Sequence, residues 1–177
     1  MRVSLVLTVI ADDKPGIVEQ LSDDILGAGA NWEESRMARL AGKFAGLLRV
    51  SIDADRADAL AAKLKKLAPA LTVVVERSAE GDTINFRTLH LELVGHDRPG
   101  IVRDISRVLA QHHVNIEELE TDTTTAPMSG EALFRARATL RMPSTVTIEQ
   151  LRRVVESLAG ELMVDLTLDD SDHVTAR

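Results

Sequence analysis

The chain has 177 residues, 45% of them apolar, and a formal charge of −7. This acidity excludes a typical binder of the nucleic-acid backbone, which needs a basic surface, and three Phe with one Trp are too few for a base-stacking platform. The absence of cysteine excludes disulfides, thiolate nucleophiles and thiolate metal sites.

The first residues run directly into a strand pattern, so we expect no signal peptide. No apolar run approaches the length of a membrane span. These patterns predict a cytoplasmic protein that does not engage membranes.

The first strand is predicted from Val3 to Ile10, an unbroken β-rich run typical of a strand buried on both faces. A turn follows, and Pro15 suits the first position of a helix because its missing N–H costs nothing there. Ile17, Leu21 and Ile25 then recur on one helical face. A strand followed by an amphipathic helix therefore opens the chain.

The rest of the first half continues with strands and one more helix. Strands are predicted from Asn31 to Leu40 and from Phe44 to Ile52, joined by a tight hairpin turn. A helix from about Asp55 ends before Pro69, and a fourth strand runs from Leu71 to Glu76. The order is βαββαβ.

The second half repeats this order 84 residues later. Ile101, Ile105 and Leu109 repeat the apolar helical face of the first half. The segment that begins at Asn115 corresponds to the one that begins at Asn31. We predict an α+β protein of two ferredoxin-like βαββαβ units with antiparallel sheets and helices on one face. The expected boundaries are 1–78 for the first unit, 79–86 for a linker, 87–168 for the second unit and 169–177 for a polar tail.

One short motif occurs in both halves, at the turn between the first strand and the first helix. An acidic residue followed by Pro-Gly at a helix start leaves free backbone N–H groups that suit a small anion. The spacing from each Pro to the following Asn is the same in both copies. The candidate ligand-binding residues are Asp13, Lys14, Pro15, Gly16, Ile17, Val18 and Asn31, with Asp97, Arg98, Pro99, Gly100, Ile101, Val102 and Asn115.

Structural roles compete with ligand binding at these positions. Asp13 and Asp97 suit a ligand ammonium, or equally a turn facing the helix dipole. Gly16 and Gly100 admit a ligand to the backbone, or equally permit close packing. For Asn31 and Asn115 a turn with positive φ is the favoured interpretation.

Catalytic and metal sites are not expected. Glu33 and Glu34, like Glu117 and Glu118, are adjacent in a strand and so should face opposite ways. The five histidines have no metal-ligand spacing, and no nucleophile, phosphate-loop or dinucleotide motif is present. We therefore predict no catalytic residue, no metal and no cofactor.

The second half carries six extra residues between its middle strands. They fall within Thr121 to Gly130, a polar segment holding Pro127. We expect Thr123 to Ser129 to form an exposed, mobile loop that does not extend the sheet fully. Two interpretations stay open: the loop contacts a partner, or it is a tolerated insertion without a role.

The repeated strand–Asp-x-Pro-Gly-Ile-Val–helix arrangement, followed by Asn, resembles ACT domains. The segment from Asn31 to Ala38, followed by Gly42 and Phe44, is similar to the tandem-ACT glycine cleavage system transcriptional repressor group. The resemblance covers the chain to about Leu168. It implies amino-acid ligands bound near the first strand–helix loop, and sheets that join side by side across repeats or subunits.

Members of this repressor group act through a DNA-binding activator protein, so the resemblance implies a non-catalytic regulator. The expected partners are a small amino acid, glycine among them, a DNA-binding transcription regulator and further copies of the chain, with no direct contact to nucleic acid. A ligand-free interaction module stays open as the alternative, and a small enzyme is the least favoured.

Overall fold

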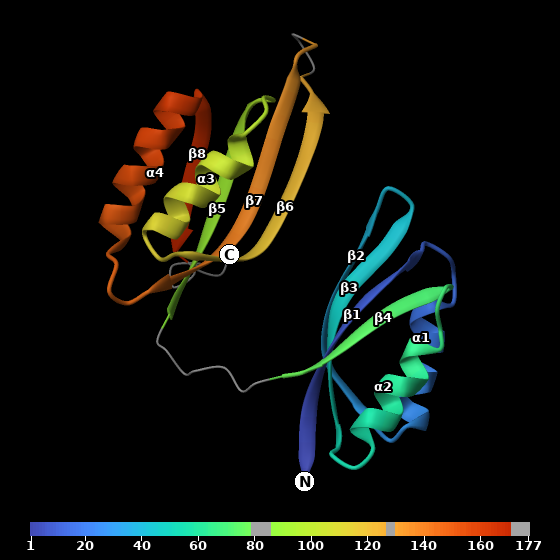
Figure 1. The fold of residues 1–177 in the computed structure, drawn as a ribbon. Coiled ribbons are helices and arrows are strands. Elements are labelled where there is room, and N and C mark those ends of the chain that lie inside the picture. The colour runs from blue at the N-terminus through green and yellow to red at the C-terminus, as the bar shows by residue number, and fades with distance from the viewer. Residues whose placement is uncertain (79–85, 127–129, 171–177) are drawn as a thin grey trace, which may run out of the picture. The chain divides into compact units, whose positions relative to one another are not determined.

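The computed structural model describes residues 1–78, 86–126 and 130–170. The chain divides into two compact units, Met1–Gly81 and Asp82–Arg177, each with four strands and two helices among the described residues (Figure 1). The first unit contains β1 (Arg2–Asp12), α1 (Ile17–Gly27), β2 (Asn31–Leu40), β3 (Lys43–Asp53), α2 (Ala57–Lys65) and β4 (Leu71–Arg77). The second contains β5 (Phe86–His96), α3 (Ile101–Gln111), β6 (Asn115–Thr125), β7 (Ala132–Pro143), α4 (Ile148–Leu162) and β8 (Val164–Asp170).

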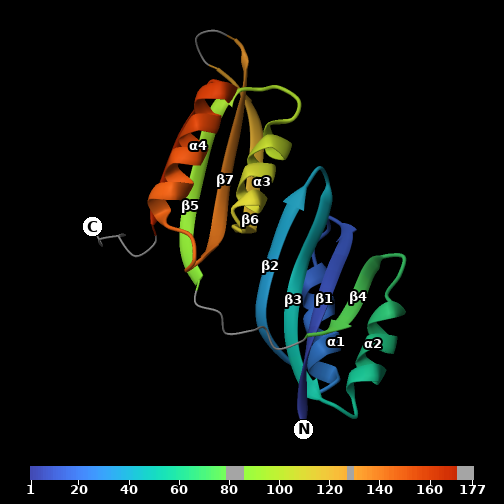
Figure 2. The same cartoon turned by 60° about the vertical axis from the view of Figure 1, so that its left-hand side comes forward.

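Each unit is an antiparallel sheet with both helices on one face (Figures 1 and 2). The strand orders are β2-β3-β1-β4 and β6-β7-β5-β8, so the first strand of each unit lies in the interior of its sheet. This confirms the α+β class and the tandem ferredoxin-like βαββαβ order.

The core of each unit lies between its sheet and its helices. Leu21 and Ile25 of α1 are buried, as the helical period predicted, and so are Leu60 and Leu64 of α2. They pack against the inward side chains of the sheet, such as Leu7. The second unit buries the corresponding helical residues in a cluster of its own.

The prediction that β1 is buried on both faces is wrong. Leu5, Leu7 and Val9 are buried, whereas Thr8 and Ile10, which alternate with the buried residues, are exposed, Ile10 by 47%. The strand has an apolar sequence, but its second face is the open face of the sheet. A run of apolar residues alone did not distinguish these two cases.

The first helix of each unit begins later than predicted. Pro15 precedes α1, which starts at Ile17, and Gly16 is the N-cap with φ +92°. Pro99 and Gly100 precede α3 in the same way, with φ +98° at Gly100. The left-handed conformation of the glycine places the helix start two residues beyond the proline.

The six extra residues change the β6–β7 hairpin less than expected. β6 runs to Thr125, and Thr123, Thr124 and Thr125 pair with β7, Thr125 with Ala132. The prediction of a loop from Thr123 is therefore wrong for these three residues, since antiparallel pairing satisfies their backbone groups. The hairpin closes through hydrogen bonds from the Ala126 N–H to the Glu131 carbonyl, 2.8 Å, and from the Gly130 N–H to the Ala126 carbonyl, 3.0 Å. The rest of the expected loop, 127–129, lies outside the described residues.

Candidate functional site

Each Pro-Gly motif forms a loop that ends in a glycine N-cap. The Gly16 carbonyl accepts the Gln20 N–H at 2.9 Å, and the Gly100 carbonyl accepts the Asp104 N–H at 2.9 Å. Neither helix has a side-chain cap, so the N–H groups of its first turn have no intrahelical partner and point out of the helix start.

Helix α4 shows the alternative arrangement. There the Thr147 hydroxyl accepts the Gln150 N–H, and the Gln150 side chain accepts the Thr147 N–H. Helix α2 also lacks a side-chain cap, so the left-handed glycine distinguishes α1 and α3, rather than the missing cap alone. Donors at a helix start, together with the positive end of the dipole, are suited to a carboxylate.

The first loop is tied to the β2–β3 hairpin by both of its acidic residues. The Asp13 N–H donates to the Gly42 carbonyl at 3.0 Å, and the Asp13 carboxylate lies 2.5 Å from the Arg39 Nε. Asp12 pairs with Lys43, whose hydrogen bond and charge hold the pKa of the Asp12 carboxyl below its ordinary value. These contacts favour the structural interpretation of Asp13.

The second loop has the same backbone tie but different side-chain contacts. The Asp97 N–H donates to the Ala132 carbonyl at 2.9 Å. Beside it, the His96 Nδ1 lies 3.5 Å from a Glu131 carboxylate oxygen. The Asp97 carboxylate makes no ion pair with any residue that the structure describes, so it differs from Asp13 in being free for other contacts.

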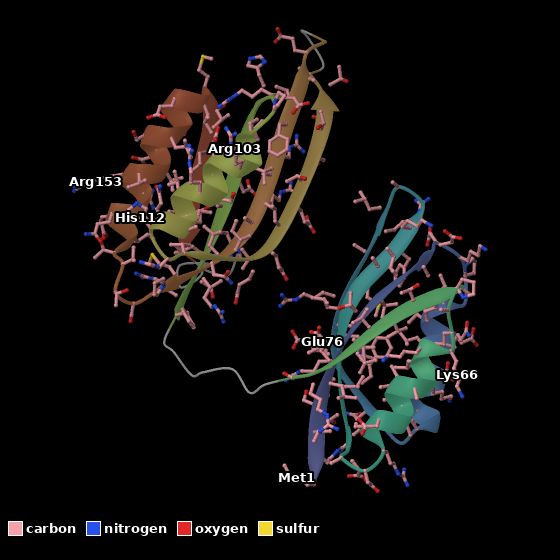
Figure 3. All side chains as sticks on the ribbon, in the orientation of Figure 1. Met1, Lys66, Glu76, Arg103, His112 and Arg153 are labelled. Atoms are coloured by element: carbon pink, nitrogen blue, oxygen red, sulfur yellow. The ribbon has the colours of Figure 1, made fainter. Side chains whose placement is uncertain are left out.

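Asp104, which the sequence analysis did not single out, makes the two loops chemically unequal. It is 9% exposed in the first turns of α3, and its Oδ1 accepts from the Arg103 Nε at 3.1 Å and the Arg103 Nη2 at 3.0 Å. Arg107 Nη2 lies 3.6 Å from the same oxygen; Arg103 is labelled in Figure 3. The corresponding residue of α1 is Gln20, which is exposed. The sequence carried one signal for this residue: an acid at position 104, next to the apolar face of a helix, where the first unit has Gln20.

The second helix start therefore has a carboxylate and an arginine of its own. A side chain at Gly100 would meet the Arg103 Nη2 at 3.5 Å and the Asp104 Oδ2 at 3.9 Å, whereas one at Gly16 would meet nothing within 4 Å. The open surroundings of Gly16 show that its φ, and not a lack of space, requires glycine there.

The remaining loop residues divide into apolar anchors and exposed positions. Ile101 is buried and Ile17 packs against its core, whereas Val18 and Val102 are 45% and 43% exposed. Pro15, Pro99, Lys14 and Arg98 are also exposed. The structure thus brings these residues together in two loops whose outer surface is solvated.

Asn31 and Asn115 are not brought to these loops within their own units. Asn31 begins β2 at the other end of α1, whose 11 residues span about 16 Å. It pairs with Ser51, and Asn115 pairs with Arg141. The prediction of a positive φ at these asparagines is wrong, because Gly29 and His113 adopt that conformation instead.

The paired glutamates also differ from prediction. A β-bulge between Trp32 and Glu34 shifts the register, so that Glu33 and Glu34 both reach Arg49, at 3.6 Å and 3.5 Å. The second unit has a bulge at the same place, where Glu117 lies 3.3 Å from Arg141. Adjacent residues do not face opposite ways at a bulge. Glu33, Glu34 and Glu117 each contact an arginine. Glu118 accepts a hydrogen bond from the Thr139 hydroxyl at 3.3 Å, so both pairs are structural.

Other features of a binding or catalytic site are sparse in the described ranges. Two grooves, of about 250 and 230 Å³, lie on the open face of the second sheet, and Val102 lines a small apolar cavity beside α3. Within residues 1–78, 86–126 and 130–170, no three His, Asp or Glu side chains gather as metal ligands. No helix in these ranges is long and apolar enough to cross a membrane.

Comparison with protein families identifies the fold. Models of the ACT domain match residues 4–77 and residues 90–156. The chain belongs to the ACT-domain family. Its two ACT domains are the two units described above, and the Pro-Gly loops are the strand–helix connections of these domains.

Relatives extend over most of the chain. The glycine cleavage system transcriptional repressor of Escherichia coli strain K12 is 24% identical over 161 residues, which cover 89% of this chain and 85% of that protein. A solved structure from Galdieria sulphuraria, described as an unknown protein, is 31% identical with a TM-score of 0.86 and covers 96% of this chain and 99% of its own. Another solved structure, provisionally assigned as a glycine cleavage system transcriptional repressor, shares the fold at 21% identity and a TM-score of 0.73, covering 96% of this chain and 98% of its own.

Proposed function

We propose that this tandem ACT protein is a non-catalytic regulator that binds a small amino acid at its Pro-Gly loops. The observation that carries the proposal is the pair of helix starts capped by left-handed glycines with free N–H groups. Similarity to a transcriptional repressor over most of both chains supports a regulatory role.

The ligand's carboxylate would accept hydrogen bonds from the backbone N–H groups of the first helical turn. Its ammonium would contact loop carbonyls or, in the second loop, the free Asp97 carboxylate. Arg103 and Arg107 balance the charge of Asp104 beside the second helix start, so both loops remain candidates for the carboxylate. Glycine is the first candidate ligand, on the similarity to the glycine cleavage repressor.

Control of transcription would pass through a DNA-binding regulator protein. The chain carries a formal charge of −7, so it is not suited to the phosphate backbone. A gel shift with the isolated chain at physiological salt should show no DNA complex. A complex that appears only with a partner regulator would support this route, and a shift by the chain alone would contradict it.

A panel of the twenty amino acids, measured by thermal shift and calorimetry, tests the ligand proposal. Gly16→Val and Gly100→Val should each weaken binding at one loop, because a β-branched residue is strained at φ +92° or +98° and projects beside the donors. Gly130→Val, with φ +73° and open surroundings, is the matched control for the strain at Gly16. Equal binding by Gly16→Val, Gly100→Val and the control would show that the ligand does not bind at these loops.

A ligand-free interaction module is the second candidate function. It is favoured by the backbone ties from Asp13 to Gly42 and from Asp97 to Ala132, which give both loops a structural role without any ligand. In that case no amino acid would change stability or produce heat, while a partner regulator would still be captured by the full chain.

A further inference from the structure

The two ACT domains present open sheet faces of opposite character. On the face away from the helices, the pairing register aligns three rows of four residues in each unit. In the first unit we call these twelve residues the apolar face: Val6, Thr8, Ile10, Glu34, Arg36, Ala38, Ala45, Leu47, Arg49, Thr72, Val74 and Glu76. In the second unit we call their counterparts the acidic face: His90, Glu92, Val94, Glu118, Glu120, Asp122, Arg135, Arg137, Thr139, Asp165, Thr167 and Asp169.

The apolar face has six apolar side chains, two arginines and two glutamates, so its formal charge is zero. Its larger apolar members are well exposed, with Ile10 at 47%, Leu47 at 53% and Val74 at 50%. Leu47 and Val74 lie on either side of Thr8 in one row. A contiguous exposed apolar patch rimmed by charges is typical of a protein contact surface.

The acidic face has one apolar side chain, six carboxylates and two arginines. Arg137 and Glu92, 3.3 Å apart, occupy the places of Leu47 and Thr8. Its formal charge of −4 would repel a second copy of itself. The two faces therefore have the same backbone register, but the apolar face is suited to association and the acidic face is suited to contact with water.

We propose that the apolar face packs against the apolar face of a second copy of this chain, as a two-fold symmetric sheet-on-sheet contact. This contact needs no ligand, so it goes beyond the amino-acid site, and it is distinct from the side-by-side joining of sheets that the family resemblance implies.

The charges of the apolar face suit this occupant. Arg36 lies on the outer strand β2, whereas Glu76 lies on the opposite outer strand β4, where Figure 3 labels it. Glu76 makes no ion pair with any residue that the structure describes. A two-fold axis along the strand direction, between two facing sheets, places β4 of each copy over β2 of the other. Glu76 of one copy then lies over the row that ends at Glu34 in its partner. Arg36 and Arg49 both contact Glu34, so Glu76 meets a cluster with one net positive charge, which makes the surface self-complementary.

The size of the face is also adequate. β1 and β4 pair over seven residues, and at ~3.3 Å per residue and ~4.8 Å per strand the four-stranded face measures roughly 23 by 19 Å. Two such faces cover about 900 Å² before the relief of the side chains is counted, which adds to the area, so the contact lies at the small end of specific interfaces, near their lower bound of ~1,000 Å². Facing sheets pack about 10 Å apart with their side chains interdigitated.

Cysteine cross-linking of the full chain tests the contact, because the protein has no cysteine of its own. Thr8→Cys places a thiol in the middle of the apolar face, and Glu92→Cys places one at the same position of the acidic face. With a short bismaleimide at micromolar protein, Thr8→Cys should become a covalent dimer at least tenfold faster than Glu92→Cys. Equal rates, or no dimer from Thr8→Cys, would overturn the proposal.

Sedimentation analysis supplies the second measurement. Leu47→Arg copies the residue found at position 137 and should raise the concentration at which the assembly dissociates by at least tenfold, with thermal stability retained because Leu47 is half-exposed. Glu120→Arg places the same side chain on the acidic face and should leave that concentration unchanged. An assembly unaffected by Leu47→Arg, a chain that stays monomeric, or an apolar face that binds only an unrelated partner protein would each contradict the two-fold contact.

Discussion

Thr8 of β1 and Glu92 of β5 occupy the same position in their two sheets, yet their neighbours share no chemistry. Thr8 pairs with Leu47 and Val74, and Glu92 pairs with Arg137 and Thr167. The two sheets thus have the same backbone register at these positions but different side chains. Each ACT domain has its own core and its own Pro-Gly loop, built in the same way, but the two differ in what their open faces can bind.

The charged row of the acidic face should contribute little to folding. Glu92→Gln removes the 3.3 Å contact with Arg137, in which both side chains are more than half exposed. We expect the free energy of unfolding to fall by less than about 1 kcal/mol. Urea unfolding followed by far-UV circular dichroism measures this change, and a larger loss would show that the row is part of the stabilising structure.

The core beneath α1 should be far more sensitive. Leu21→Ala removes a fully buried side chain and should lower the free energy of unfolding of the first unit by about 2–5 kcal/mol. Leu26→Ala, at a side chain 74% exposed on the same helix, is the control and should change it by less than about 0.5 kcal/mol. The single tryptophan, Trp32, packs against this core, so its fluorescence reports the first unit. Similar losses in the two variants would mean that α1 is not packed as described.

The capping box of α4 predicts that its removal lowers the stability of the second unit alone. Thr147→Ala leaves the Gln150 N–H without its side-chain acceptor and should lower stability by about 1 kcal/mol. The far-UV circular dichroism transition should move while the Trp32 fluorescence transition stays in place. Thr145→Ala, two residues earlier and exposed, provides the comparison. A shift of the fluorescence transition would show that the two units unfold together.

The Asp12–Lys43 contact predicts a small acid-range effect. Because Lys43 lowers the pKa of Asp12 in the folded chain, the contact stabilises the fold above the ordinary Asp pKa of about 3.9. That contribution is lost as the pH falls through the lowered folded-state pKa. Lys43→Gln should raise the pKa of Asp12 toward its ordinary value in an NMR titration of the carboxyl carbon. Lys63→Gln, which breaks a 2.8 Å contact with Asp24, should leave the pKa of Asp12 unchanged.

Removal of one helix-start donor should weaken ligand binding without unfolding the chain. Val18→Pro deletes an N–H of the first turn of α1, where no intrahelical bond is lost, and Val18 is 45% exposed. We expect at least a tenfold loss of amino-acid affinity by calorimetry. Glu149→Pro at the equivalent position of α4 imposes the same local strain and should bind as well as the unaltered chain. Unchanged affinity in Val18→Pro would exclude this N–H as a ligand donor.

The sequence predicted those features that depend on periodicity. Leu21 and Ile105 lie on apolar helical faces, and the repeat of Gly16 at Gly100 placed the two loops in register. The open face could not be predicted, because Thr8 and Ile10 continue an apolar run whose exposure depends on which elements cover the sheet. Burial on one side only is a tertiary property.

The candidate site was predicted in part. The loop residues do gather at the helix starts, but Asn31 lies at the far end of α1, since equal spacing in sequence does not imply proximity in space. Asp104 was not recognised, because its burial depends on the two arginines that contact it. The bulge that brings Glu33 and Glu34 to Arg49 likewise has no signature in a single sequence.

The most direct test of amino-acid sensing at the Pro-Gly loops follows the backbone amides themselves. The ¹⁵N-labelled full chain is titrated with glycine and then with the other amino acids, with methylamine as a ligand that lacks the carboxylate. The account predicts saturable chemical-shift changes at the N–H groups of residues 17–19 or 101–103, and none with methylamine. Saturable changes confined to other parts of the chain, or no change at millimolar concentrations of any amino acid, would contradict it.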